Sequence, residues 1–237
     1  MTERAPAFPP LMTGHAIDAG IDPFEKACAM AALGCDAGLI VYAPGVDRLK
    51  AALVMAPEVP LEQAMAMLPA CGIGFQNALG ALAPPEVAVH LEWAGGLRVN
   101  GAACGRLRVA AGGSDPGALP GWLVVGLDLP LMLVGLAPGE TPDRTALYEE
   151  GCAEVDPVDL LEAWARHTLV WITRWDEDGA RALHGQWRGL AHGIGEEIDI
   201  DAETGTFLGV DEHFGMLFRR GDDTRLIPLS TVLETSA

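Results

Sequence analysis

Short strands and tight turns between residues 87 and 109 constrain the fold of this chain more than any other segment. Branched residues alternate with polar or small ones on both sides of two turn signals. Gly95-Gly96 marks the first turn, and Asn100-Gly101 is a strong short-range signal for a hairpin. The segment therefore predicts three consecutive antiparallel strands within a larger sheet.

The sequence around this ribbon alternates between strand and helix patterns. Asp22-Pro23 predicts the start of a helix that ends at Gly34, with Glu25 closing a capping box. A turn is expected at Pro44-Gly45. We expect further strands at residues 38–43, 51–56 and 122–129, and helices at 61–68, 70–82, 156–172 and 176–190, the first two separated at Pro69.

The composition changes after residue 190. Short strand candidates at residues 197–200, 205–210, 215–219 and 225–228 are separated by Gly and Asp turns, a pattern typical of a small all-β unit. We therefore expect two domains, residues 1–190 and residues 191–237.

Charge and composition exclude several classes of function. The chain has 237 residues, is 50% hydrophobic and carries a net charge of −18, with 33 acidic and 15 basic residues. Nucleic acids and membrane surfaces attract cationic proteins, so we expect neither as a partner. No uninterrupted apolar run approaches a membrane span and the N-terminus lacks a signal-peptide layout, so we expect a cytoplasmic protein. The five cysteines are scattered without a Cys-x-x-Cys pair, which predicts free, mostly buried thiols.

The 87–109 ribbon resembles the active-site ribbon of biotin and lipoate protein ligases. That family pattern is Lys-Trp-Pro-Asn-Asp-Leu, a turn, and then a strand carrying a lysine. Trp93 and Leu97 match it, whereas Glu92 takes the place of the first lysine and Ala103 that of the catalytic lysine. Residues 205–218 similarly resemble a ribbon of the SH3-like module that follows the ligase domain. The resemblance thus runs in order from about residue 21 to residue 233.

This resemblance implies an α/β (α+β) fold: a mixed β-sheet flanked by helices, followed by a small C-terminal SH3-like β-barrel. It implies a reaction in which biotin or lipoate attacks Mg-ATP and the acyl group then moves to a lysine of a biotinyl or lipoyl carrier domain. The ligand-binding positions it implies are Trp93, Gly95, Gly96, Asn100, Gly105, Arg106, Gly126 and Asp128.

Several family elements that serve this chemistry differ here. Asp22-Pro23-Phe24 stands where the family has Ser-Thr-Asn, and residues 44–50 replace a long arginine-rich loop. Asp128 replaces the second glycine of Gly-Ile-Gly-x-Asn, and its carboxylate would repel both ATP and an acid ligand. Lys50, Arg48 and Arg106 are the cations that could compensate for the missing lysine.

Other polar residues allow two interpretations each. His90 and Glu92 could ligate a metal but fit a polar strand face better, because no third ligand accompanies them. Asp199, Asp201 and Glu203 fit a solvated turn better than a calcium loop. We therefore predict no metal site. Arg106 and Arg108 form either a solvated stripe or a carboxylate clamp, and the sequence leaves both open.

Three functions agree with these features. The chain could hold a small carboxylate ligand or a carrier domain without complete adenylation chemistry. It could be an active, divergent ligase that uses Lys50, Arg48 and Arg106. It could also be a structural, partner-binding protein with an acidic surface. ATP binding separates the second from the other two, and ligand binding without ATP separates the first from the third.

Overall fold

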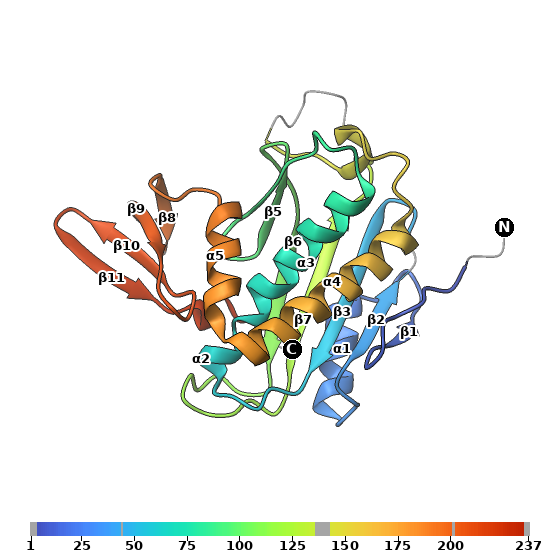
Figure 1. Cartoon of the computed structure of the whole chain (residues 1–237), viewed down its shortest axis with the longest axis horizontal. Helices are drawn as coiled ribbons and strands as arrows, with labels where there is room; N and C mark the ends of the chain where they lie inside the picture. Colours follow the sequence, from blue (N-terminus) through green and yellow to red (C-terminus); the bar gives the residue numbers. More distant parts are fainter. Residues whose placement is uncertain (1–3, 44, 136–142, 201, 235–237) are drawn as a thin grey trace.

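A seven-stranded mixed sheet, flanked by helices, forms the centre of the computed structural model (Figure 1). The structure describes residues 4–43, 45–135, 143–200 and 202–234. Strand order in the sheet is β1-β2-β3-β7-β6-β5-β4; β1 and β2 are parallel, and the other neighbouring pairs are antiparallel. The strands are β1 (Thr13–Ala16), β2 (Leu39–Ala43), β3 (Arg48–Met55), β4 (Val89–Leu91), β5 (Gly96–Val99), β6 (Ala102–Ala111) and β7 (Leu123–Pro130). The predicted fold class is confirmed.

Helices cover both faces of this sheet. α1 (Pro23–Ala32) packs on one face, where Phe24 and Val124 belong to a small apolar cluster. The short α2 (Leu61–Ala64) leads into α3 (Met67–Leu82), which packs with α4 (Pro157–Asp178) on the other face, and α5 (Ala180–Leu190) follows. The segment Leu61–Leu82 is apolar enough to cross a membrane by length and composition, but 72% of its most apolar stretch is buried inside the protein. This burial is what a core helix requires.

The β4–β5–β6 ribbon follows the prediction and adds a bulge. Asn100 and Gly101 both have positive φ (51° and 91°), as a two-residue hairpin turn requires. Pairing shifts between β5 and β6, so that Gly96 faces Arg106 while Arg98 faces Ala103. This one-residue shift places Ala103 and Arg106 on the same face of the sheet.

A second, four-stranded antiparallel sheet follows the main body, in the order β11-β10-β9-β8. Its strands are β8 (Glu197–Ile200), β9 (Glu203–Val210), β10 (Met216–Arg220) and β11 (Asp223–Ile227). The small all-β unit is thus present, and within the described residues its pairing runs as an open series from β11 to β8. Its closure into an SH3-like barrel stays a prediction.

Local details correct four expectations. Glu25 does not close a capping box, because its carboxylate accepts a hydrogen bond from Arg108 at 2.8 Å. The helix break falls between Ala64 and Met67, because Pro69 lies in the first turn of α3, where a missing N–H is tolerated. The 156–172 helix extends to Asp178 and ends at Gly179. Strand β3 begins at Arg48, which leaves a very short link after β2.

Two expectations concern residues outside the described ranges. Pro44 belongs to the predicted turn after β2, and Asp201 belongs to the acidic 199–203 segment.

Candidate functional site

A groove of about 590 Å³ lies on the face of the main sheet that α1 covers only in part. Strands β3, β6 and β7 form its floor. Arg48, Gly105, Arg106 and Asp128, four of the residues that the sequence indicated, meet in it. The other lining residues are Asp47, Ala103, Pro130, Met132, Leu133, Val134, Arg144 and Thr145.

An ion pair crosses the floor of this groove. Arg48 Nε donates to Asp128 Oδ1 at 2.8 Å, and an Nη of the same guanidinium lies 2.7 Å from that oxygen. Lys50 faces Asp128 in the strand register, and its Nζ lies 3.9 Å from Asp22 Oδ2 at the start of α1. Asp128 therefore neutralises Arg48, and neither Arg48 nor Lys50 stands apart from a carboxylate.

Side chains fill the sheet face at the end of the groove next to α1. The ring of Phe24 lies so close to Gly126 that a Cβ on this glycine would come within 2.6 Å of it. The Arg108 guanidinium lies 4.1 Å from the centroid of the same ring, a cation–π contact. By the resemblance, Phe24 stands where the ligases have part of their Ser-Thr-Asn motif, so an aromatic ring takes the place of a polar side chain.

Arg108 is a clamp for the protein's own carboxylates. It contacts Asp22 at 3.1 Å, Glu25 at 2.8 Å and Glu234 at 2.6 Å. The hydrogen bond to Glu234 raises the pKa of Arg108 further, despite partial burial. Arg106, two residues earlier on the same strand face, is exposed and makes no ion pair with any residue of the described chain. Arg108 is therefore occupied by carboxylates of the protein itself, whereas Arg106 remains exposed at the groove.

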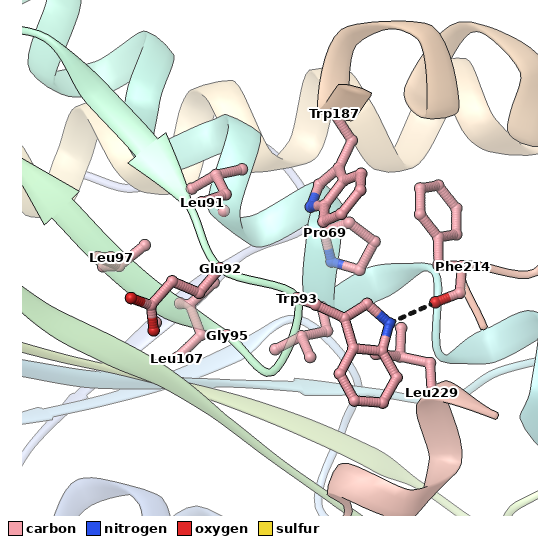
Figure 2. A pocket seen from close by; sticks show the side chains of 13 residues that line it. Pro69, Leu91, Glu92, Trp93, Gly95, Leu97, Leu107, Trp187, Phe214 and Leu229 are labelled. Carbon is pink, nitrogen blue, oxygen red and sulfur yellow. Dashed lines mark hydrogen bonds between the residues drawn. The ribbon is translucent and has the colours of Figure 1, made fainter. Parts of the chain in front are cut away.

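The predicted residues of the first turn lie elsewhere, at the junction with the C-terminal sheet. Trp93, Gly95 and Gly96 border an apolar cavity of about 10 Å³ together with Trp187 and Phe214 (Figure 2). The Trp93 indole donates to the Phe214 carbonyl oxygen at 2.7 Å. A cavity this small has room for about one water molecule at most, so side chains fill the space between these residues. Trp93 also borders a more open groove of about 570 Å³ between the ribbon and the C-terminal sheet.

Glu92 and Asn100, two further polar residues of the ribbon, form hydrogen bonds within the protein. Glu92 accepts from Arg98 Nε at 2.6 Å, and Asn100 Nδ2 donates to Glu150 at 2.8 Å. His90 Nδ1 is buried without a hydrogen-bond partner in the described structure. Across the described ranges, no group of three His, Cys, Asp or Glu residues could hold a metal ion.

The sequence did not identify Arg144, which closely follows residues 136–142 outside the described ranges, as a residue of the site. Arg144 forms an isolated parallel bridge with Ala103, so it lies next to the position of the ligases' catalytic lysine. The segment around it carried no strand or helix signal in the sequence. The pairing depends on three-dimensional contact with β6, so no local pattern could have found it.

Residues 8–189 match the model of the biotin/lipoate A/B protein ligase family, and this chain belongs to that family. Residues 194–235 match a domain of unknown function, DUF4444.

Three individual proteins are similar to this chain in sequence or in fold. A biotin protein ligase-like protein of unknown function from Silicibacter sp. tm1040 is 65% identical, with a TM-score of 0.93 over 98% of this chain and 100% of that one. Biotin--[acetyl-CoA-carboxylase] ligase from Paracoccus denitrificans is 26% identical over 76% of this chain and 77% of its own. The biotin protein ligase of Aquifex aeolicus shares the fold, with a TM-score of 0.72 at 17% identity, over 92% of this chain and 96% of that one.

Proposed function

We propose that this protein binds a small carboxylate ligand, free or on a carrier domain, in the groove of β3, β6 and β7, with adenylate formation impaired. The proposal rests on the lack of available positive charge at the positions where the ligases need it. Arg48 is neutralised by Asp128, and Ala103 offers no charge where the ligases have a catalytic lysine. Adenylate formation needs preorganised positive charge around the reacting phosphate, whereas binding of one carboxylate needs far less.

The groove itself supports the binding half of this proposal. Its volume of about 590 Å³ lies in the range of small-molecule sites, and both apolar and cationic residues line it. Filling of the neighbouring face by Phe24 and Arg108 restricts a ligand to the end near Arg106. We also propose the division into residues 1–190 and 191–237, and a cytoplasmic location.

Isothermal titration with biotin, lipoate and octanoate, each with and without Mg-ATP, tests the proposal. Binding of at least one acid, with the same Kd when Mg-ATP is present, supports it. Absence of heat with all three acids contradicts it and favours the structural, partner-binding function.

An active, divergent ligase is the second candidate. Arg106 favours it, because this guanidinium faces the groove without an ion pair in the described structure and could act on a phosphate. The relationship to the Paracoccus denitrificans ligase points the same way. For this candidate, acid binding is strengthened by Mg-ATP and pyrophosphate is released.

A further inference from the structure

Arg144 stands beside Ala103 through two backbone hydrogen bonds. Ala103 N donates to the Asp143 carbonyl oxygen at 2.9 Å, and Thr145 N donates to the Ala103 carbonyl oxygen at 2.9 Å. Residues paired in a β-bridge project to the same side of the sheet, so Arg144 shares the face of Ala103 and Arg106. All three line the groove.

A chain of hydrogen bonds fixes the backbone that carries Arg144. The buried hydroxyl of Thr145 donates to Glu150 Oε1 at 2.6 Å, and Asn100 Nδ2 donates to Glu150 Oε2 at 2.8 Å. Asn100 Oδ1 in turn accepts from the backbone N–H of Ala88 at 2.9 Å. The segment before the 3₁₀ helix Leu147–Glu150 is thus tied to the hairpin turn of the ribbon, and the base of the Arg144 side chain has a defined position.

Two arginines that line the groove have no ion-pair partner among the described residues of this acidic protein. Other arginines of this face have carboxylate partners: Arg48 has Asp128, and Arg98 has Glu92. Arg106 and Arg144 make no ion pair with any residue in the described part of the chain, although acidic residues outnumber basic ones by 33 to 15. Two guanidinium groups facing one groove repel each other, and an anion between them would be attracted by both and offset this repulsion.

Apolar side chains line the groove next to these arginines. Pro130, Met132, Leu133 and Val134 follow the end of β7 and border the same space. A hydrocarbon chain laid along them would be removed from water, which favours binding by about 25 cal/mol for each Å² buried. The geometry therefore combines a cationic end with an aliphatic wall.

We propose that Arg106 and Arg144 clamp the carboxylate of an aliphatic acid whose hydrocarbon chain lies along residues 130–134. This inference rests on the proposed function and names its ligand class and its binding residues. Arg144 provides the positive charge that Ala103 lacks, from the neighbouring segment instead of from the strand itself. The clamp binds the acid and takes part in no covalent step.

Titration of octanoate and octanamide into the wild type and variants tests the clamp. Octanoate should bind the wild type more tightly than the neutral octanamide. Arg144→Gln and Arg106→Gln should each weaken the binding of octanoate roughly 10- to 100-fold, because each removes one charge-assisted contact. The affinity for octanamide should stay unchanged. Arg144→Lys should restore part of the affinity. Arg181→Gln, a matched change on the exposed surface of α5, should have no effect.

Three different results would overturn the clamp, the ligand class or the proposed function. Octanoate binding that Arg144→Gln leaves unchanged, in a variant with wild-type circular dichroism, overturns the clamp and leaves the proposed function standing. Binding of biotin without binding of octanoate overturns the aliphatic ligand class alone. Failure of the wild type to bind any of the acids removes the proposed function and the clamp together.

Discussion

Asp128 sets the charge of the groove floor. Its carboxylate holds the Arg48 guanidinium at 2.7–2.8 Å, in a place where the sequence indicated only a repulsive charge. Asp128 is 20% exposed and Arg48 is 41% exposed, so the pair adds little to stability. Asp128 therefore repels anions and also neutralises the guanidinium of Arg48.

Asp128→Asn is expected to tighten the binding of a carboxylate ligand about tenfold, because it removes a negative charge and releases Arg48. Titration calorimetry with octanoate at low salt measures the change. Asp36→Asn removes the same charge from an exposed turn away from the groove and should leave the affinity unchanged. Equal or weaker binding by Asp128→Asn would contradict the role assigned to the ion pair.

Sequence analysis at this scale identified several groove residues but not their partners. Arg48, Gly105, Arg106 and Asp128 lie together in the groove, because they occupy strands that are neighbours in the sheet. Arg144 escaped notice, because its bridge to Ala103 joins segments 41 residues apart and follows no periodic pattern. Contacts of this kind depend on packing and not on local sequence.

Helix α3 illustrates how one element is fitted to its neighbours. It is buried among the sheet and α4, and its small residues allow close approach. A Cβ at Gly74 would lie 2.9 Å from the backbone of Thr168 on α4, whereas a Cβ at Gly80 would meet only the tip of Gln76 at 3.8 Å. A Cβ therefore has no room at Gly74 but fits at Gly80 of the same helix.

Gly74→Ala should lower the free energy of unfolding by about 1–3 kcal/mol, because α3 and α4 would have to separate. Gly80→Ala, on the exposed side of the same helix, should raise it by about 0.5–1 kcal/mol through helix propensity. Urea denaturation followed by circular dichroism measures both. Equal effects of the two substitutions would show that α3 and α4 do not pack as described.

Buried thiols should make the protein less stable in alkali. Burial raises the pKa of Cys104 on β6 to about 12, and burial also raises that of Cys71 on α3. The folded state keeps both protons while the unfolded state loses them above about pH 9, so stability falls as pH rises toward the folded pKa values. The expected slope is at most about 1.4 kcal/mol per pH unit for each thiol.

Urea denaturation between about pH 8 and pH 10.5, with a reductant present, measures this dependence. The double variant Cys71→Ala/Cys104→Ala should be less stable at pH 8 but should show a flatter decline. Parallel declines in the wild type and the double variant would rule out the thiols as the cause.

The whole molecule joins its two sheets through aromatic contacts. Trp93 donates to the Phe214 carbonyl oxygen, and Trp187 of α5 meets the Phe214 ring at 6.2 Å in an edge-to-face arrangement (Figure 2). The order of elements and the composition change near residue 190 predicted two sheets, because strand and helix periodicities are local. Their junction was not predictable, since it brings together residues 121 positions apart.

Trp93→Phe should lower the free energy of unfolding by about 1–3 kcal/mol, because it leaves the buried Phe214 carbonyl oxygen without its donor. Thermal denaturation measures the loss. Trp122→Phe is the matched control, because the structure gives no hydrogen bond for this partly buried indole. It should lower the free energy of unfolding by less than Trp93→Phe does. A larger loss from the control would contradict the importance of this junction.

We propose that this ligase fold keeps a ligand groove but lacks the charges that adenylation needs. ATP–pyrophosphate exchange in the presence of biotin, lipoate or octanoate tests this most directly, because exchange reports the first chemical step without a carrier domain. We expect no exchange above that of a heat-denatured sample with any of the acids. Acid-dependent exchange would show that the protein forms an acyl-adenylate and would contradict the proposed impairment of adenylation.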